Sequence, residues 1–167
     1  MDRSKQLARR IRVLLVVFVV GLVLSGLTAF PLVTELNILG NILDIDPSLS
    51  PEQYDGLRYW IALVGQGFRD TGTRYPFLAY GTDWLAFGHL VIAVAFLGPL
   101  RDPIRNVWIV EFGMIACVGV IPLALIAGEV RGIPFYWRLI DCTFGILGFV
   151  PLWLSRRDIK ELTRLRG

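Results

Sequence analysis

The chain has 167 residues, enough for one domain, with a net charge of +3; 54% of its residues are hydrophobic. Its mean hydropathy of +0.59 is high for a soluble protein of this size, and apolar runs near 20 residues indicate membrane spans. The sequence shows no basic patch of the nucleic-acid-binding type. Cys117 and Cys142 both fall inside the apolar runs, which argues against a disulfide framework.

Four apolar runs, taken in chain order, predict transmembrane helices at about 13–30, 77–98, 104–128 and 134–154. The first run follows a basic segment, as in a signal peptide. It is as long as a full span, however, and lacks a clean small-residue cleavage site, so we expect a retained helix. Small residues at Gly21, Ser25 and Gly26 favour close helix packing there. Pro122 predicts a kink in the third span.

The segment between the first two spans, residues 31–76, has the pattern of amphipathic helices lying at the membrane surface. Leucines recur at helical spacing from Leu32 to Leu43. A second helix is expected to begin at Ser50, with Ser50 as its N-cap, and to end before a polar turn at 69–74. Residues 155–167 form a basic amphipathic segment, which we expect to be a solvated tail that docks on anionic lipid headgroups.

The distribution of Lys and Arg predicts the orientation. Twelve of the 17 fall in the N-terminal segment, the 100–105 loop and the 155–167 tail, whereas five fall in residues 31–76 and 129–138. The positive-inside rule then places both termini in the cytoplasm. The expected fold is therefore an all-α integral membrane protein, a single domain over 1–167, built as a four-helix bundle with an extracytoplasmic cap at 31–76.

Polar side chains inside the apolar runs are the candidate site residues, because such groups are costly in lipid and usually face a bundle interior or cavity. Asp83, Arg138 and Asp141 are expected at one depth in the outer leaflet, roughly 6–10 Å from the ends of their spans at ~1.5 Å per residue. We predict that they form one cluster. The cluster is either a clasp between helices or, with Trp84 at its aromatic rim, the floor of a ligand pocket.

His89, the one histidine of the sequence, is expected nearer the middle of the membrane, within reach of Glu111. Three interpretations stay open for His89: a satisfied core histidine, a role in ligand binding or in a proton relay with Glu111, and axial ligation of a tetrapyrrole. One His and one Glu are too few for a metal site, so none is predicted. No cofactor is predicted either.

The sequence carries no catalytic signature, and whether the chain is an enzyme stays open. The favoured hypothesis is a non-enzymatic, multi-pass protein of the bacterial inner membrane, either an accessory subunit or a binder of a lipid or small amphipathic ligand. The alternatives are a membrane-embedded enzyme acting on a lipidic substrate and a proton-coupled carrier. The expected partners are the bilayer, a membrane protein or a second copy of the chain. A pocket is expected on the extracytoplasmic side, under the helix at 51–68.

Overall fold

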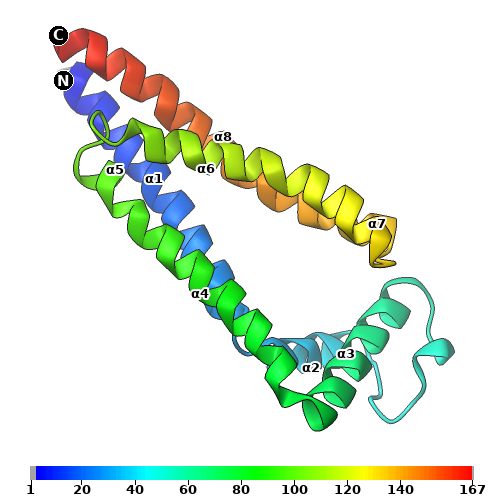
Figure 1. Ribbon diagram of the computed structural model, residues 1–167. Helices are drawn as coiled ribbons and strands as arrows, with labels where there is room; N and C mark the ends of the chain where they lie inside the picture. Colours follow the sequence, from blue (N-terminus) through cyan, green and yellow to red (C-terminus); the bar gives the residue numbers. More distant parts are fainter. Residues whose placement is uncertain (1–2, 167) are drawn as a thin grey trace. The chain divides into compact units, whose positions relative to one another are not determined.

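All regular structure in the protein is helical. The computed structural model describes residues 3–166 and contains no strand among them (Figure 1). The elements are, in order, α1 (Arg3–Thr28), α2 (Leu32–Ile42), η1 (Pro51–Gln53), α3 (Gly56–Arg74), η2 (Pro76–Ala79), α4 (Tyr80–Ala95), α5 (Leu97–Arg101), α6 (Val107–Pro122), η3 (Leu123–Ala127), α7 (Gly128–Val130) and α8 (Phe135–Arg166).

Four helical stretches are long and apolar enough to cross a membrane, as the sequence predicts. They cover Arg3–Thr28, Pro76–Arg101, Val107–Val130 and Phe135–Arg166. The first and the last are longer than predicted, because the flanking basic segments continue the helices instead of ending them. This confirms an all-helical chain with four apolar helices of the length that membrane proteins use.

The third apolar helix begins at Val107, three residues later than the predicted start near residue 104. Asp102 does cap a turn, since its Oδ1 accepts the backbone N–H of Arg105 at 3.1 Å. The side-chain amide of Asn106 then donates to the carbonyl oxygens of Asp102 at 2.9 Å and Gly98 at 3.3 Å. These bonds hold residues 102–106 as a tight connection, and the α-helical pattern of α6 starts only at Val107.

Contacts within the chain divide it into two compact units, each described here by itself. Unit 1 contains residues 3–22 and 92–166, and unit 2 contains residues 23–91. The helices α1 and α4 contribute to both.

Unit 1 is organised around α6 and α8, which run side by side (Figure 1). A Cβ atom added at Gly145 would lie 2.5 Å from the backbone oxygen of Cys117, so the two helix backbones approach closely there. Near the two ends of the chain, the first part of α1 packs against α6 and α8. The resulting core contains Leu7, Ile11, Leu15, Phe96, Ile109, Val110, Leu152, Ile159 and Leu162.

The last part of α8 corrects the prediction of a solvated tail. The helix continues without a break from the apolar run to Arg166, and it buries Ser155, Asp158, Ile159 and Leu162 against the core of unit 1. The reason is the spacing of Leu152, Ser155, Ile159 and Leu162, which places one face of the helix against α1. An ion pair between Arg3 and Glu161, 2.8 Å long, closes this end of the unit.

The α-helical pattern of the third apolar stretch changes at Pro122, where the sequence predicts a kink. Proline lacks the N–H that would bond to the carbonyl four residues earlier. Beyond it, residues 123–127 form a π-helical segment, η3, before α7 resumes the α-helical pattern. The wider turns of such a segment leave backbone carbonyls available to other donors.

In unit 2, the end of α1 packs closely on α4 through a glycine. A Cβ atom added at Gly26 would lie 3.0 Å from the Cβ of His89 and 3.1 Å from the backbone oxygen of Ala86. This is the close helix packing that the small residues of the first span predict, and Gly26 is the residue that provides it in unit 2.

The second helix of the 31–76 segment starts later than predicted. Ser50 opens only the short turn η1, and its hydroxyl donates to the carboxylate of Glu52, which lowers the pKa of Glu52. Tyr54 and Asp55 are extended, and α3 begins at Gly56, whose φ of +54° suits glycine. The helix then continues through the expected 69–74 turn to Arg74.

Candidate functional site

The candidate site of unit 1 is an ion pair at the edge of a groove between α6 and α8. The Nε atom of Arg156 donates to Oε1 of Glu111 at 2.7 Å. Both side chains stay partly exposed, 34% for Arg156 and 41% for Glu111. The pair connects the first turns of α6 to α8 just past its apolar stretch.

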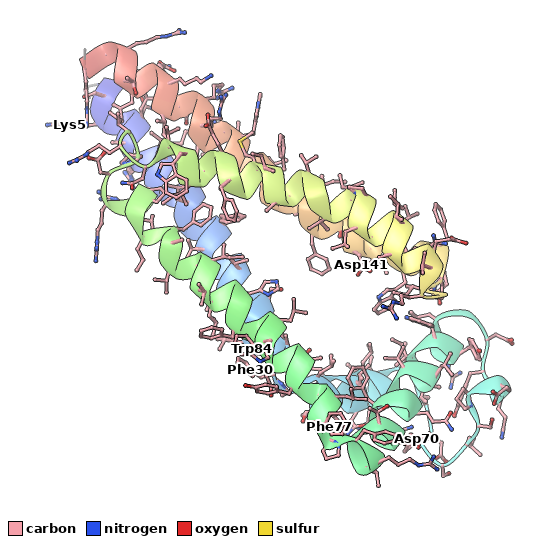
Figure 2. The ribbon with its side chains drawn as sticks, viewed as in Figure 1. Lys5, Phe30, Asp70, Phe77, Trp84 and Asp141 are labelled. Atoms are coloured by element: carbon pink, nitrogen blue, oxygen red, sulfur yellow. The ribbon has the colours of Figure 1, made fainter. Side chains whose placement is uncertain are left out.

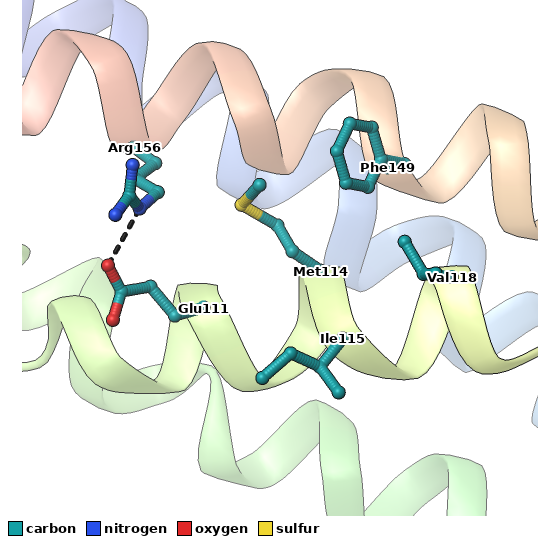
Figure 3. Close-up of a pocket in the computed structure, with 6 residues that line it drawn as sticks. All are labelled: Glu111, Met114, Ile115, Val118, Phe149 and Arg156. Carbon is teal, nitrogen blue, oxygen red and sulfur yellow. Dashed lines mark hydrogen bonds and ion pairs between the residues drawn. The ribbon is translucent and has the colours of Figure 1, made fainter.

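Apolar side chains continue the groove beyond this ion pair. Met114, Ile115 and Val118 of α6 face Phe149 of α8 across a space of about 440 Å³ that is open along one side. The volume falls in the range of roughly 300–1,000 Å³ typical of small-molecule sites. Figure 3 shows the charged pair at one end, Met114 in the middle, and Val118 with Phe149 at the other end.

Two exposed tryptophans mark the level of the charged end. Trp108 precedes Glu111 by three residues on α6, and Trp153 precedes Arg156 by three residues on α8. Tryptophan side chains concentrate at the boundary between hydrocarbon and headgroups. Each member of the ion pair therefore lies one helical turn from an exposed tryptophan on its own helix.

This position differs from the expected pocket. The sequence places a charged pocket near Asp83, Arg138 and Asp141, at the ends of the apolar runs remote from the basic termini. The groove between α6 and α8 lies at the basic end of unit 1, where Arg156 is in the first turn of the segment predicted to be a solvated tail. A pocket at Asp83, Arg138 and Asp141 stays a prediction. Because α8 continues as a helix, Arg156 stays on the face directed at α6.

Arg138 is nearly buried, with 12% of its side chain exposed, and it joins α8 to two neighbouring elements. It forms an ion pair with Glu129 of α7, and its Nη1 donates to the carbonyl oxygen of Leu125 in η3 at 3.2 Å. Its guanidinium lies 5.3 Å from the ring centre of Phe135. The counter-ion that the structure shows for Arg138 is Glu129, a residue outside the predicted cluster.

The predicted cluster of Asp83, Arg138 and Asp141 is divided between the two units. Asp141 lies on α8 in unit 1 (Figure 2) and is half-buried. Asp83 is half-buried on α4 in unit 2. Trp84 is exposed and makes edge-on ring contacts with Tyr80 and Phe87, both with centroids 5.9 Å apart. The meeting of these residues in one ligand site stays a prediction.

His89 lies half-buried in unit 2, with its Nδ1 atom 2.7 Å from the carbonyl oxygen of Leu85 on the preceding turn. This contact satisfies one ring nitrogen within α4. Glu111 is engaged by Arg156 in unit 1. A relay between His89 and Glu111, and ligation of a tetrapyrrole by His89, stay predictions.

Unit 2 has a groove of its own, also of about 440 Å³, beneath α3. Its lining comes from α2, α3, η2 and α4 and is uncharged: Val33, Val64, Gly67, Phe68, Thr71, Gly72, Leu78, Ala79 and Thr82. The predicted pocket between the second, third and fourth spans is a different place and stays a prediction. Without a charged group to orient a ligand, the groove of unit 2 is a weaker candidate than the groove of unit 1.

Sequence reasoning missed two partners at the basic end, Arg156 and Asp158. Asp158 is fully buried, with its Oδ2 atom 3.2 Å from Nε of Arg10. The signal that would have found them is the apolar spacing from Leu152 to Leu162, which continues the helix of the fourth span through Arg156.

Comparisons of the chain with known protein families, with curated proteins and with solved structures find no match.

Proposed function

We propose that this chain is a non-enzymatic membrane protein that binds a lipid or small amphipathic ligand in the groove between α6 and α8. The observation that carries this proposal is the pairing of Arg156 with Glu111 at the entrance of an otherwise apolar groove. Such a site matches a molecule with a polar head and an apolar chain. The head would lie at the interface, and the chain would follow Met114 and Val118.

The composition of the groove supports binding over catalysis. Its lining contains no hydroxyl, thiol or imidazole group, so the carboxylate of Glu111 is the one group in it that could act as a base or nucleophile. Its two charged residues engage each other. An enzyme acting on a lipid would need a further reactive group, and the groove does not supply one.

The proposal includes a location and an orientation. The four apolar helices suggest a membrane protein, and we place it in a bacterial-type inner membrane with both termini in the cytoplasm. The asymmetry of 12 basic residues against five supports this orientation. The charged end of the groove then lies at the cytoplasmic interface, and residues 31–76 lie outside.

Native mass spectrometry of the protein purified in mild detergent tests the proposal. We expect a bound lipid on the wild-type chain. Val118→Trp places an indole in the groove and should remove the lipid, whereas Ala116→Trp adds the same side chain at an exposed position of α6 outside the lining. The Ala116→Trp protein should retain the lipid.

Two results would contradict the proposal. One is equal lipid retention by both tryptophan variants, which would mean that lipid binds elsewhere. The other is a stoichiometric protein partner in place of lipid, which would favour an accessory subunit.

A further inference from the structure

The ion pair of Glu111 and Arg156 leaves part of each group without a protein contact. Arg156 binds Glu111 through Nε, and within residues 3–166 no other contact of its guanidinium is found, so the two Nη groups remain available. Glu111 accepts this bond through Oε1, which leaves Oε2 (Figure 3). The groove entrance thus presents hydrogen-bond donors with positive charge beside an acceptor with negative charge.

The Nη groups of Arg156 and the Oε2 atom of Glu111 determine which charges a matching lipid head group carries. A phosphate oxygen pair fits the fork of an arginine. A purely anionic head on Arg156 would also lie next to the carboxylate of Glu111, and like charges repel. A head that carries a positive group beside its phosphate avoids this repulsion, because the cation meets Glu111.

We infer that the groove binds a zwitterionic phospholipid whose head carries a primary ammonium beside its phosphate, the phosphoethanolamine head. The inference rests on the proposed function, and it adds the class of head group. The phosphate lies on the Nη groups of Arg156, and the ammonium donates to Oε2 of Glu111. An acyl chain follows the apolar lining from Met114 to Val118.

The dimensions of the groove agree with this placement. Glu111 and Val118 are seven residues apart on α6, which is about 10 Å at a rise of about 1.5 Å per residue. The groove therefore holds the upper part of one acyl chain and leaves the remainder to the bilayer. Trp108 and Trp153 place the head at the headgroup level.

Two common phospholipid heads fit less well. A phosphocholine head has a cation of the same charge but no N–H, so it cannot donate to Glu111. A phosphoglycerol head has no cation, so Glu111 repels it. The basic residues nearby, such as Lys160 and Arg164, attract any anionic lipid, but this attraction is screened over about 8–10 Å at physiological salt.

The test is lipid enrichment in nanodiscs that contain equal parts of phosphoethanolamine, phosphocholine and phosphoglycerol lipids with identical acyl chains. The protein is released by native mass spectrometry at physiological salt, and the retained lipid is identified. We expect the phosphoethanolamine lipid to be enriched about fivefold over either other lipid, the factor that corresponds to about 1 kcal/mol for a partly exposed ion pair.

Glu111→Gln should abolish this preference while a lipid stays bound. Glu161→Gln is the matched control, because Glu161 also has 41% of its side chain exposed and pairs with an arginine at the same end of unit 1. The control should keep the preference. Glu111→Asp, which retains the carboxylate, should keep it in part, and circular dichroism checks that each variant is folded.

The outcomes separate this inference from the proposed function. Enrichment of the phosphoglycerol lipid, or equal retention of the three lipids, would overturn the head-group assignment and leave a lipid site in place. Loss of the preference in Glu161→Gln as well would also overturn it. No retained lipid on the wild-type chain would contradict the proposed function itself.

Discussion

At the scale of single residues, Asp158 has the most demanding environment in unit 1. Its side chain is 1% exposed, with one oxygen 3.2 Å from Nε of Arg10 and the other 3.4 Å from Nη2 of Arg157. Both arginines are about half exposed. The free-energy cost of desolvation therefore falls mainly on the carboxylate of Asp158, and the positive charges of the two arginines offset it.

Asp158 is buried and its arginine partners are exposed, so removing Arg10 and removing Asp158 should have unequal effects on stability. Arg10→Gln leaves a buried carboxylate with Arg157 alone and should lower the free energy of unfolding by about 1–3 kcal/mol. Asp158→Asn should cost less, because it leaves two arginines that water already solvates. Thermal unfolding in detergent, followed by circular dichroism, measures both.

The control for this prediction is Arg9→Gln, which removes a neighbouring, exposed arginine of α1. It should change stability by less than about 0.5 kcal/mol, as is usual for surface substitutions. If Arg10→Gln and Arg9→Gln have the same effect, Arg10 does not compensate the charge of Asp158.

At the scale of elements, the packing of α6 on α8 positions the groove. The two helices approach closely at Gly145, where an added Cβ would lie 2.5 Å from the backbone oxygen of Cys117. Backbone atoms cannot move aside as a flexible side chain can. A larger residue at this point therefore has to separate the helices.

We expect Gly145→Ala to destabilise unit 1 by about 1–3 kcal/mol, the usual range for overpacking. Gly119→Ala is the matched control, because nothing lies within 4 Å of a Cβ added there. In an α-helix, this control should gain about 0.5–1 kcal/mol from the glycine replacement. Thermal unfolding of both variants in one detergent decides the prediction, and equal stabilities would contradict the close approach.

At the scale of the whole molecule, the predicted orientation in the membrane depends on the two ends of the chain, which are far apart in the sequence. Both ends of the described chain belong to the basic end of unit 1, where α1 begins and α8 ends. In the proposed topology, both ends lie on one side of the membrane, and the positive-inside rule assigns that side to the cytoplasm. The loop before α3 then lies outside.

Cysteine labelling checks this orientation, with Cys117 and Cys142 replaced by Ala. We expect Asp55→Cys to react with an impermeant maleimide in intact cells, because residue 55 is exposed in the loop before α3. Lys160→Cys, exposed on α8, should react only after permeabilisation. Equal reaction of both residues in intact cells would contradict the proposed topology.

The number and approximate place of the apolar helices could be predicted from the sequence, because a span needs about 20 apolar residues and these runs are local. Boundaries were less predictable where two local signals compete. Ser50 has the composition of an N-cap, yet the extended residues Tyr54 and Asp55 delay α3 to Gly56. Asp102 likewise caps a turn instead of a helix, since Asn106 binds the same connection.

The sequence by itself determined that the chain is helical, apolar enough for a membrane and basic at both ends. These properties depend on composition and on periodicity along one segment. Only the tertiary structure decided the partners: Arg156 for Glu111, Glu129 for Arg138, and Arg10 for Asp158. Depth along a helix limits which residues can meet, but the rotation of each helix about its axis selects the pair. That rotation depends on packing at contacts such as Gly145, which one helix alone does not encode.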